Sequence, residues 1–179
     1  RRFHAASVGK AMTATLAFQL AESGALDLDA PITGLLPADE LRGLFVAEGV
    51  DRAGEVTVAQ LLSHTSGVAD YFEGRTDAGR SFVDGVVAEP DRLWTPAALL
   101  DHSRTHQRPV AMPGTRFSYS DTGFVLAARV IEEKDLTGAS LARVLRELID
   151  EPGRLSPMEE AAGRLARPDA AARVADLLD

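Results

Sequence analysis

Apolar positions in this chain gather into helical segments separated by turns rich in glycine and proline. The first segment runs from Phe3 to Gly24, and its apolar residues cover most of the circumference of a helix. A helix that is apolar on nearly all sides is typical of a protein core. The sequence therefore predicts a buried helix from near Ser7 to Gly24, with these apolar residues: Val8, Ala11, Met12, Ala14, Leu16, Ala17, Phe18, Leu20 and Ala21.

A second helix of the same kind is predicted between Thr122 and Glu133, with Ser120 and Asp121 as its N-terminal cap. Its apolar residues also exceed one stripe, so the helix needs a partner on more than one side. We expect it to pack against the first helix. The residues that carry this pattern are Phe124, Val125, Ala127, Ala128, Val130 and Ile131.

Caps locate two shorter helices. Thr57 predicts a helix over 58–63, which ends in the His64-Thr65-Ser66-Gly67 turn. Thr95 followed by Pro96 predicts a helix that runs to about Ser103, because proline is favoured at the first helical position. The sequence therefore places helices on both sides of residues 69–91.

The remaining segments are less regular. Residues 26–32 are expected to form a short extended turn against the core, and residues 35–54 to form loop and short helix. Glycines and charges over 69–91 predict a long surface excursion, a feature that often binds ligands. From residue 138 the pattern changes to short amphipathic surface helices, so we expect two parts, 1–137 and 138–179.

Composition excludes several classes of function. The chain has 19 basic and 27 acidic residues and a net charge of −8, which is the wrong sign for a partner with a phosphate backbone. It has no cysteine, and this excludes disulfides, zinc–thiolate sites, iron–sulfur clusters and thiol nucleophiles. We find no signal peptide at the N-terminal end and no apolar run long enough to cross a bilayer, so localisation is not readable from a targeting segment.

Ser7 and Lys10 form the strongest candidate for chemistry. A spacing of three residues on a helix puts both side chains on one face. Burial and the positive helix end would lower the pKa of Lys10, so that it could accept the serine proton, and nearby backbone N–H groups could bind an oxyanion. The alternative is a serine that caps the helix beside an ordinary surface lysine.

Three segments in order resemble the serine β-lactamase and penicillin-binding-protein-like family, in its class C β-lactamase, DD-peptidase and esterase branch. They are ASVGKAMTATLAFQLAESGALDLDAPI, VTVAQLLSHTSGVADYF and PGTRFSYSDTGFVLAARVIEE, and together they cover residues 3 to about 133. The resemblance implies an acyl-transfer enzyme with an α/β fold. It also implies an extracytoplasmic or secreted location.

Carried over by motif, the resemblance implies that Ser7 is the acylated nucleophile and Lys10 the neighbouring base. Tyr119 falls where that branch has the tyrosine of Tyr-x-Asn, which is held to exchange protons with the lysine. A phenol beside a lysine can relay a proton to a leaving group. No cofactor and no metal are expected, and the substrate would be a small ester or amide.

Asp121 departs from the family pattern, which has asparagine at this position. An ionised aspartate only accepts hydrogen bonds, whereas asparagine can also donate one to a substrate carbonyl. This difference puts β-lactam hydrolysis in doubt. The alternative role of Asp121 is to cap the helix that follows it.

Other candidate residues have plainer interpretations. The turn that contains His64 is expected to be structural. His102 and His106 have the spacing of a metal pair, but no third ligand is evident, so we expect a solvated helix end and no metal. The aromatic residues are expected in the core or at its rim, with lining of an acyl pocket as the alternative: Tyr71, Phe72 and Trp94.

Two family features are missing from the sequence. We find no Lys-Thr-Gly triad or His-x-Gly variant after Tyr119, and no strand-like run at either end. We therefore expect a mainly α chain that represents the helical part of the α/β fold, with most of the sheet absent. Without a sheet, uncovered apolar surface would favour self-association.

Residues from about 131 to 179 also resemble the C-terminal helices of MurG-type N-acetylglucosaminyltransferases. Our leading interpretation of the chain is a serine hydrolase that acts on esters, β-lactams or D-Ala-D-Ala-like peptides, either active or inactivated by truncation. A non-catalytic helical binding module or remnant is the alternative. A glycosyltransferase fragment is a third reading, and the lack of a glycine-rich phosphate-binding turn argues against it.

Overall fold

The computed structural model describes residues 6–77, 79, 81–134, 146 and 150. The chain divides into two units, Arg1–Leu136 and Thr137–Asp179, and the account below concerns the first. Apart from residues 146 and 150, the helices predicted for the tail lie outside the described residues.

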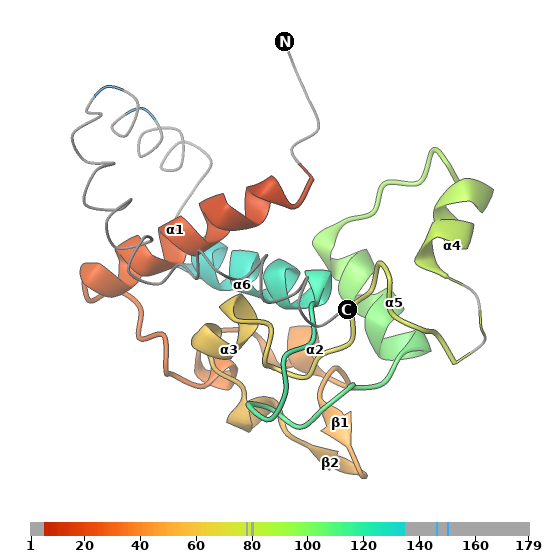
Figure 1. Cartoon of the computed structure of the whole chain (residues 1–179), viewed down its shortest axis with the longest axis horizontal. Helices are drawn as coiled ribbons and strands as arrows, with labels where there is room; N and C mark the ends of the chain where they lie inside the picture. The colour runs from red at the N-terminus through yellow and green to blue at the C-terminus, as the bar shows by residue number, and fades with distance from the viewer. Residues whose placement is uncertain (1–5, 78, 80, 135–145, 147–149, 151–179) are drawn as a thin grey trace, which may run out of the picture. The chain divides into compact units, whose positions relative to one another are not determined.

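The described part is mainly helical, as expected, and its only sheet is a small hairpin (Figure 1). Strands β1 and β2 are antiparallel, with Val46 opposite Asp51. Glu48 and Gly49 connect them with positive φ angles of 53° and 78°, which a two-residue hairpin turn requires. The elements in chain order are α1 Val8–Glu22, η1 Ile32–Gly34, α2 Ala38–Leu41, β1 Val46–Ala47, β2 Val50–Asp51, η2 Ala53–Glu55, α3 Val58–Leu62, α4 Phe82–Ala88, α5 Pro96–His106 and α6 Asp121–Glu133.

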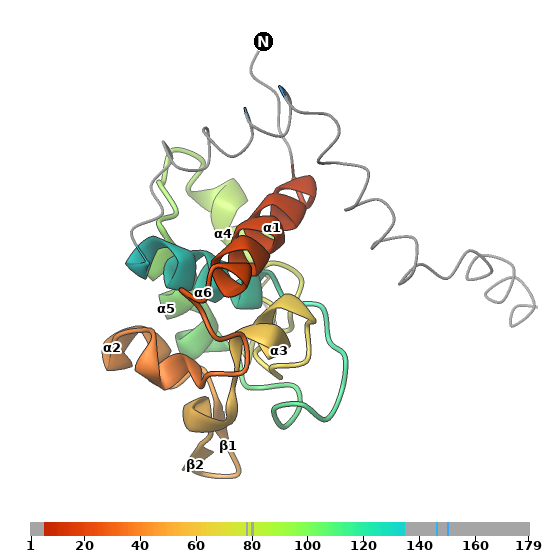
Figure 2. The same cartoon turned by 90° about the vertical axis from the view of Figure 1, so that its left-hand side faces the viewer.

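Helix α6 lies at the centre of this unit. It contacts α1, α3 and α5, and both views show it between α1 and the lower helices (Figures 1 and 2). The predicted packing of the first helix against this one is confirmed. The buried residues of α6 form one broad face of the helix: Thr122, Gly123, Leu126, Ala127, Val130 and Ile131. The other predicted apolar positions are half-buried: Phe124, Val125 and Ala128.

The predicted cap signals locate α3 and α5 correctly. The Thr57 hydroxyl accepts a hydrogen bond from the Gln60 N–H, and the Gln60 side chain accepts one from the Thr57 N–H, so both form a capping box. Thr95 caps α5 with a single hydrogen bond, which its hydroxyl accepts from the N–H of Ala98. Helix α5 continues to His106, past the predicted end at Ser103.

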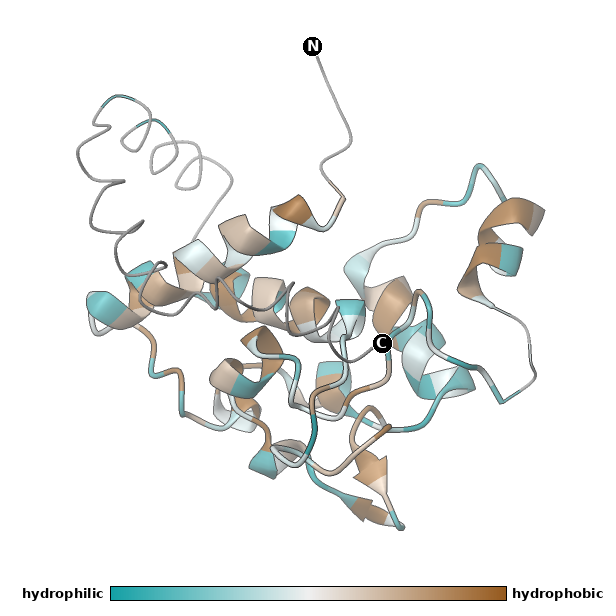
Figure 3. Cartoon of the chain, in the orientation of Figure 1, coloured by the Kyte–Doolittle hydropathy of each residue, from teal (hydrophilic) through white to brown (hydrophobic). Residues whose placement is uncertain are grey.

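The prediction of an all-round buried first helix is wrong. Only Leu16 and Ala17 of α1 are buried, whereas Val8 is 67% and Phe18 is 54% exposed. In Figure 3 the start of this helix is brown, the colour of hydrophobic residues. Among the described elements, α6 is the main neighbour of α1.

The prediction of an irregular excursion over residues 69–91 is also wrong in part. Phe82–Ala88 form α4, and Ser81 and Asp84 make a reciprocal capping box at its start. Phe82 is buried and its ring contacts that of Trp94 at 4.6 Å between centroids. Ser81 followed by Asp84 at the third helical position indicates this helix start, whereas the prediction rested only on the glycines and charges of the segment.

Among the described residues, no helix has both the length and the apolar character needed to cross a membrane.

Gly67 lies where two backbone segments pack closely against each other. Its φ is +78°, and a Cβ there would lie 2.1 Å from the carbonyl oxygen of Ala111. Gly67→Ala should therefore destabilise the fold strongly in urea unfolding, because the backbone at 111 must move. Gly24→Ala is the matched control: its φ is +75°, but nothing lies within 4 Å of the added Cβ. The control should cost only about 1 kcal/mol, the penalty of a left-handed backbone. Equal losses would contradict the close packing.

Candidate active site

The four residues predicted for the site lie together where α1 and α6 begin. The Ser7 Oγ is 2.9 Å from the Tyr119 hydroxyl oxygen and 3.3 Å from Lys10 Nζ, which donates to it. Lys10 also forms an ion pair with Asp121. Thus one hydroxyl, one phenol, one ammonium and one carboxylate form a continuous chain of contacts.

The Ser7 hydroxyl is available for chemistry because it does not cap its helix. Ser7 precedes Val8, the first residue of α1, but its side chain makes no cap hydrogen bond. Its contacts are instead with Tyr119 and Lys10. This geometry disfavours the alternative in which Ser7 is an ordinary cap.

Lys10 is a cation in this arrangement, contrary to the predicted direction of its pKa. Burial lowers the pKa of Lys10, but hydrogen bonds and charges from Asp121 and Tyr119 outweigh the burial and leave the pKa raised. The sequence argument considered the helix end and burial and lacked the carboxylate. Lys10 Nζ also lies 5.1 Å from the ring centroid of Tyr119, within the range of a cation–π contact.

Asp121 is not the helix cap. The cap of α6 is Ser120, whose Oγ accepts the Gly123 N–H at 3.1 Å. Asp121 occupies the first helical position, and its own N–H donates to Asp70 Oδ1 at 3.1 Å. The Asp121 side chain is therefore free of capping duty and pairs with Lys10.

Asp70 was not identified from the sequence as a residue that shapes the site. Its buried carboxylate accepts three backbone hydrogen bonds, from the N–H groups of Phe72, Glu73 and Asp121. It thus fixes the start of α6 to the loop after His64-Thr65-Ser66-Gly67. The signal was an aspartate next to a turn, where it commonly bonds the backbone two residues on.

His64 contacts Tyr119 and the residue that follows it, Ser120. Its Nδ1 accepts the Ser120 N–H at 3.1 Å, and its ring stacks on that of Tyr119 with 4.4 Å between centroids. Burial first, and the positive charge of Lys10 second, lower the pKa of His64, although Asp121 and Asp70 oppose this. His64 is therefore held in its neutral form.

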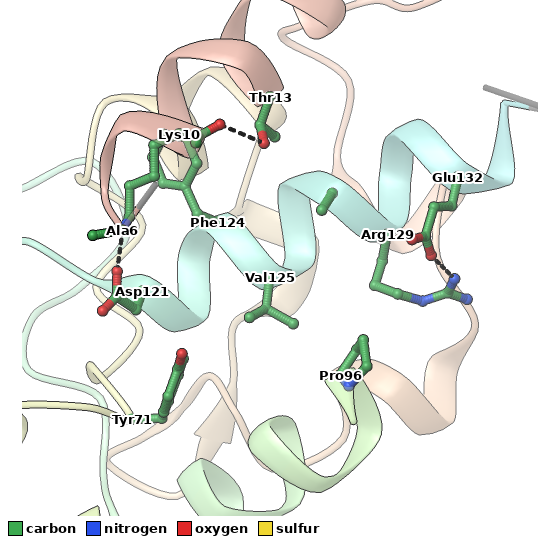
Figure 4. A pocket seen from close by; sticks show the side chains of 12 residues that line it. Ala6, Lys10, Thr13, Tyr71, Pro96, Asp121, Phe124, Val125, Arg129 and Glu132 are labelled. Carbon is green, nitrogen blue, oxygen red and sulfur yellow. Dashed lines mark hydrogen bonds and ion pairs between the residues drawn. The ribbon is translucent and has the colours of Figure 1, made fainter. Parts of the chain in front are cut away.

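A cavity of about 360 Å³ opens beside Lys10, between α1, α6 and the start of α5 (Figure 4). Lys10 and Asp121 point toward one another at one end, and Arg129 and Glu132 do so at the other. Tyr71 lines the cavity, which supports the alternative that this aromatic residue borders a pocket. The other lining residues are Ala6, Gly9, Thr13, Pro96, Phe124, Val125 and Ala128.

Within the described part of the chain, no group of three or more histidine, aspartate or glutamate side chains is arranged to hold a metal ion. His102 is not at a solvated helix end as expected, because its half-buried ring packs 5.2 Å from that of Phe82. Burial and the neighbouring His106 lower the pKa of His102.

Comparison with models of known protein families matches residues 1–175 to the β-lactamase family. The chain belongs to the β-lactamase family. Structural neighbours named as an amidohydrolase and an amidase agree with the predicted class of hydrolase at this coarse level. The match covers most of the tail as well as the helical unit.

Among curated proteins, penicillin-binding protein 4 of Amycolatopsis lactamdurans is 33% identical over 154 residues, which are 84% of this chain and 34% of that protein. The chain thus spans about a third of the length of this relative. A UDP-N-acetylglucosamine–N-acetylmuramyl-(pentapeptide) pyrophosphoryl-undecaprenol N-acetylglucosamine transferase of Anaeromyxobacter sp. (strain K) is 55% identical over only 51 residues, 28% of this chain and 13% of that enzyme. Such a short match supports the glycosyltransferase-like tail weakly.

Two solved structures illustrate the fold. A D-stereospecific amidohydrolase from Streptomyces sp. is 34% identical with a TM-score of 0.66, and the match covers 79% of this chain and 40% of that one. The D-amino acid amidase from Ochrobactrum anthropi SV3 with L-phenylalanine is 29% identical with a TM-score of 0.54, and covers 74% and 32%.

The raised pKa of Lys10 predicts how stability depends on pH. A raised pKa in the folded state contributes stability that is fully present below the unfolded value, near 10.4, and is lost as the pH rises through the folded value. Asp121→Asn should therefore lower the melting temperature at pH 7, and the gap to the parent should narrow above about pH 10. Thermal unfolding between pH 7 and 11 measures this gap.

The matched control is Asp101→Asn, which removes a carboxylate that is 74% exposed and 3.9 Å from Arg104. An exposed pair of this kind contributes little, so this variant should unfold like the parent at every pH. A gap for Asp121→Asn that is constant to pH 11 would mean that Asp121 does not raise the pKa of Lys10.

Proposed function

We propose that this chain carries the acyl-transfer site of a serine hydrolase, in which Ser7 forms an ester with the substrate and water then hydrolyses it. The observation that carries the proposal is the position of Ser7 Oγ, which lies within hydrogen-bond reach of both Tyr119 and Lys10. A nucleophile and its proton acceptor at this distance are the signature of covalent catalysis.

In the first step, Ser7 Oγ bonds to the substrate carbonyl carbon while its proton passes to the Tyr119 oxygen, which has released its own proton to solvent. Tyr119 is closer to Ser7 than Lys10 is, and Lys10 already carries a proton. Lys10 therefore acts as a cation that stabilises negative charge on the phenol oxygen and on Ser7 Oγ. This differs from the role of base that the family resemblance implied.

When the tetrahedral species collapses, Tyr119 gives the proton to the leaving alcohol or amine, and the bond between the carbonyl carbon and the leaving group breaks. Water then attacks the ester on Ser7, loses a proton to Tyr119 and releases the acid, and Ser7 regains a proton. Each proton taken by Tyr119 is returned, so the site is restored after each turnover.

Small esters and amides are the substrates that this site supports. The cavity beside Lys10 is large enough for a compact acyl group. Relatives named as amidohydrolase, amidase and penicillin-binding protein support the same substrate class. Asp121 cannot donate a hydrogen bond while it is ionised, so it offers no help to an amide or lactam carbonyl.

A non-catalytic binding module is the second candidate. Its support is the apolar outer side of α1, where Val8 and Phe18 are largely exposed, since large exposed apolar patches mark interaction surfaces. Self-association through this side is part of the candidate. A penicillin-binding protein homologue from Pyrococcus abyssi, described as octameric, is 32% identical with a TM-score of 0.55 over 82% of this chain and 30% of that one.

Labelling distinguishes the two candidates. A fluorophosphonate should modify Ser7 and no other serine. Among the described serines, Ser7 is the one whose hydroxyl contacts both a phenol and an ammonium group. Peptide mass mapping identifies the modified residue. Ser7→Ala should abolish labelling, and Ser23→Ala, at the end of the same helix, should leave it unchanged.

Folded protein that takes no label, or takes it on a different serine, would rule out Ser7 as the nucleophile and favour the binding module. Circular dichroism of the same sample shows whether it is folded.

Asp121 predicts a preference among substrates. Activated esters should be hydrolysed faster than penicillins or D-Ala-D-Ala peptides, since a missing hydrogen bond to an amide carbonyl costs about 1–3 kcal/mol, or roughly 10- to 100-fold in rate. Asp121→Asn should raise acylation by a β-lactam and change ester turnover little. Steady-state kinetics with matched ester and penicillin measure the ratio.

An equal change for both substrates would mean that Asp121 acts through Lys10 and does not face the substrate. A fall in β-lactam acylation alone would contradict the proposed preference.

A further inference from the structure

His64 is the residue that follows the C-cap of α3, and its backbone is left-handed with a φ of +57°. Histidine, asparagine and aspartate accept this conformation more often than other non-glycine residues do. The left-handed turn directs both the carbonyl and the imidazole of His64 at the segment that carries Tyr119, as the following contacts show.

His64 accepts hydrogen bonds from the residues on either side of Tyr119 in the sequence. The N–H of Ser118 donates to the His64 carbonyl oxygen at 2.8 Å, and the N–H of Ser120 donates to His64 Nδ1 at 3.1 Å. Both backbone groups that flank Tyr119 are therefore bonded to one residue. These bonds fix the peptide that follows the Tyr119 Cα and the peptide between residues 117 and 118.

The imidazole also fixes the ring of Tyr119. The two rings stack with 4.4 Å between centroids and 29° between planes. Phe124 lies 5.1 Å and Phe117 lies 5.8 Å from the imidazole centroid, so the imidazole is itself held by neighbours. A shift of the imidazole would thus move the phenol that meets Ser7 Oγ at 2.9 Å.

We propose that His64 is a positioning residue, which holds Tyr119 at Ser7 through a carbonyl, a ring nitrogen and a stacked ring. The inference rests on the proposed function for the role of Tyr119 in proton transfer. The contacts themselves are independent of that role, and this allows the two to be tested separately.

The arrangement requires Nδ1 to be unprotonated, because it accepts the Ser120 N–H. A proton on Nδ1 would set two donors against each other and place a second cation near Lys10. The charged groups around His64 are Lys10, which opposes its protonation, and Asp121 and Asp70, which favour it. Burial and Lys10 outweigh the two carboxylates, so the pKa of His64 lies below its usual value and acid pH should release Tyr119.

Two substitutions separate the contacts. His64→Gly removes the ring and Nδ1 without backbone strain at this φ, whereas His64→Asn tolerates the same φ and supplies an oxygen near the position of Nδ1. We expect His64→Gly to slow acylation of Ser7 by about 10- to 100-fold, the scale of an error of about 1 Å in placement, with KM little changed. His64→Asn should restore part of the rate.

A double-mutant cycle with Tyr119→Phe shows whether the effect passes through Tyr119. If it does, His64→Gly should cost little further rate when Tyr119 is already phenylalanine. A full additional loss in that background would overturn the proposal, because it would indicate general loss of structure.

The pH profile supplies a second readout. The acylation rate of the parent should fall at acid pH as His64 gains a proton, and His64→Asn should lack this component. His106→Asn, which changes an exposed histidine of α5, should retain it. An identical acid limb in the parent and in His64→Asn would contradict the proposal.

Nuclear magnetic resonance tests the same contacts without catalysis. The chain has two tyrosines, so Tyr71→Phe leaves Tyr119 as the sole tyrosine signal. Its ring resonances should move as His64 titrates, and should lose the stacking shift in His64→Gly. Absence of both changes overturns the positioning role. Their presence together with unlabelled Ser7 would support the positioning role and reject the proposed function.

Discussion

The site depends on one constraint, the hydrogen bonding of the segment after α3 to the start of α6. His64 and Asp70 accept the N–H groups of Ser120 and Asp121, and the Ser120 hydroxyl donates to the carbonyl of Ala69. The first N–H groups of a helix lack partners within the helix, and their satisfaction here by distant residues locks two parts of the chain together. Tyr119 precedes these bonded residues directly, so its place follows from them.

The ion pair between Lys10 and Asp121 connects α1 to the start of α6. Helix α1 is buried only at Leu16 and Ala17, on its second half, whereas Lys10 lies on its first turn and Ser7 directly precedes it. Polar contacts to Tyr119 and Asp121 therefore hold Ser7 in place where apolar packing is thin. The same carboxylate that holds the turn also keeps Lys10 charged, so structure and charge in the site have a common origin.

Local signals were sufficient for much of the fold. Thr57, Thr95 and Ser120 marked the starts of α3, α5 and α6, because a cap is set by residues within one turn. Burial of α1 was mispredicted because exposure depends on which distant elements cover a helix. The direction of the pKa shift of Lys10 was mispredicted for the same reason, since Asp121 is 111 positions away along the chain and adjacent only in the fold. The sequence indicated the turn that contains His64, but it did not indicate that the His64 ring stacks on Tyr119.

The open position of the site bears on how it can accelerate a reaction. Tyr119 is 40% exposed and the Lys10 side chain is 21% exposed, so water reaches both side chains. Fixed charges stabilise a transition state less when water screens them than in a dry site. In the proposed reaction, placement must then supply a larger share of the rate, and we propose that the His64 contacts provide it for Tyr119. Substrates with good leaving groups suit such a site, because they demand less from electrostatic stabilisation than amides do.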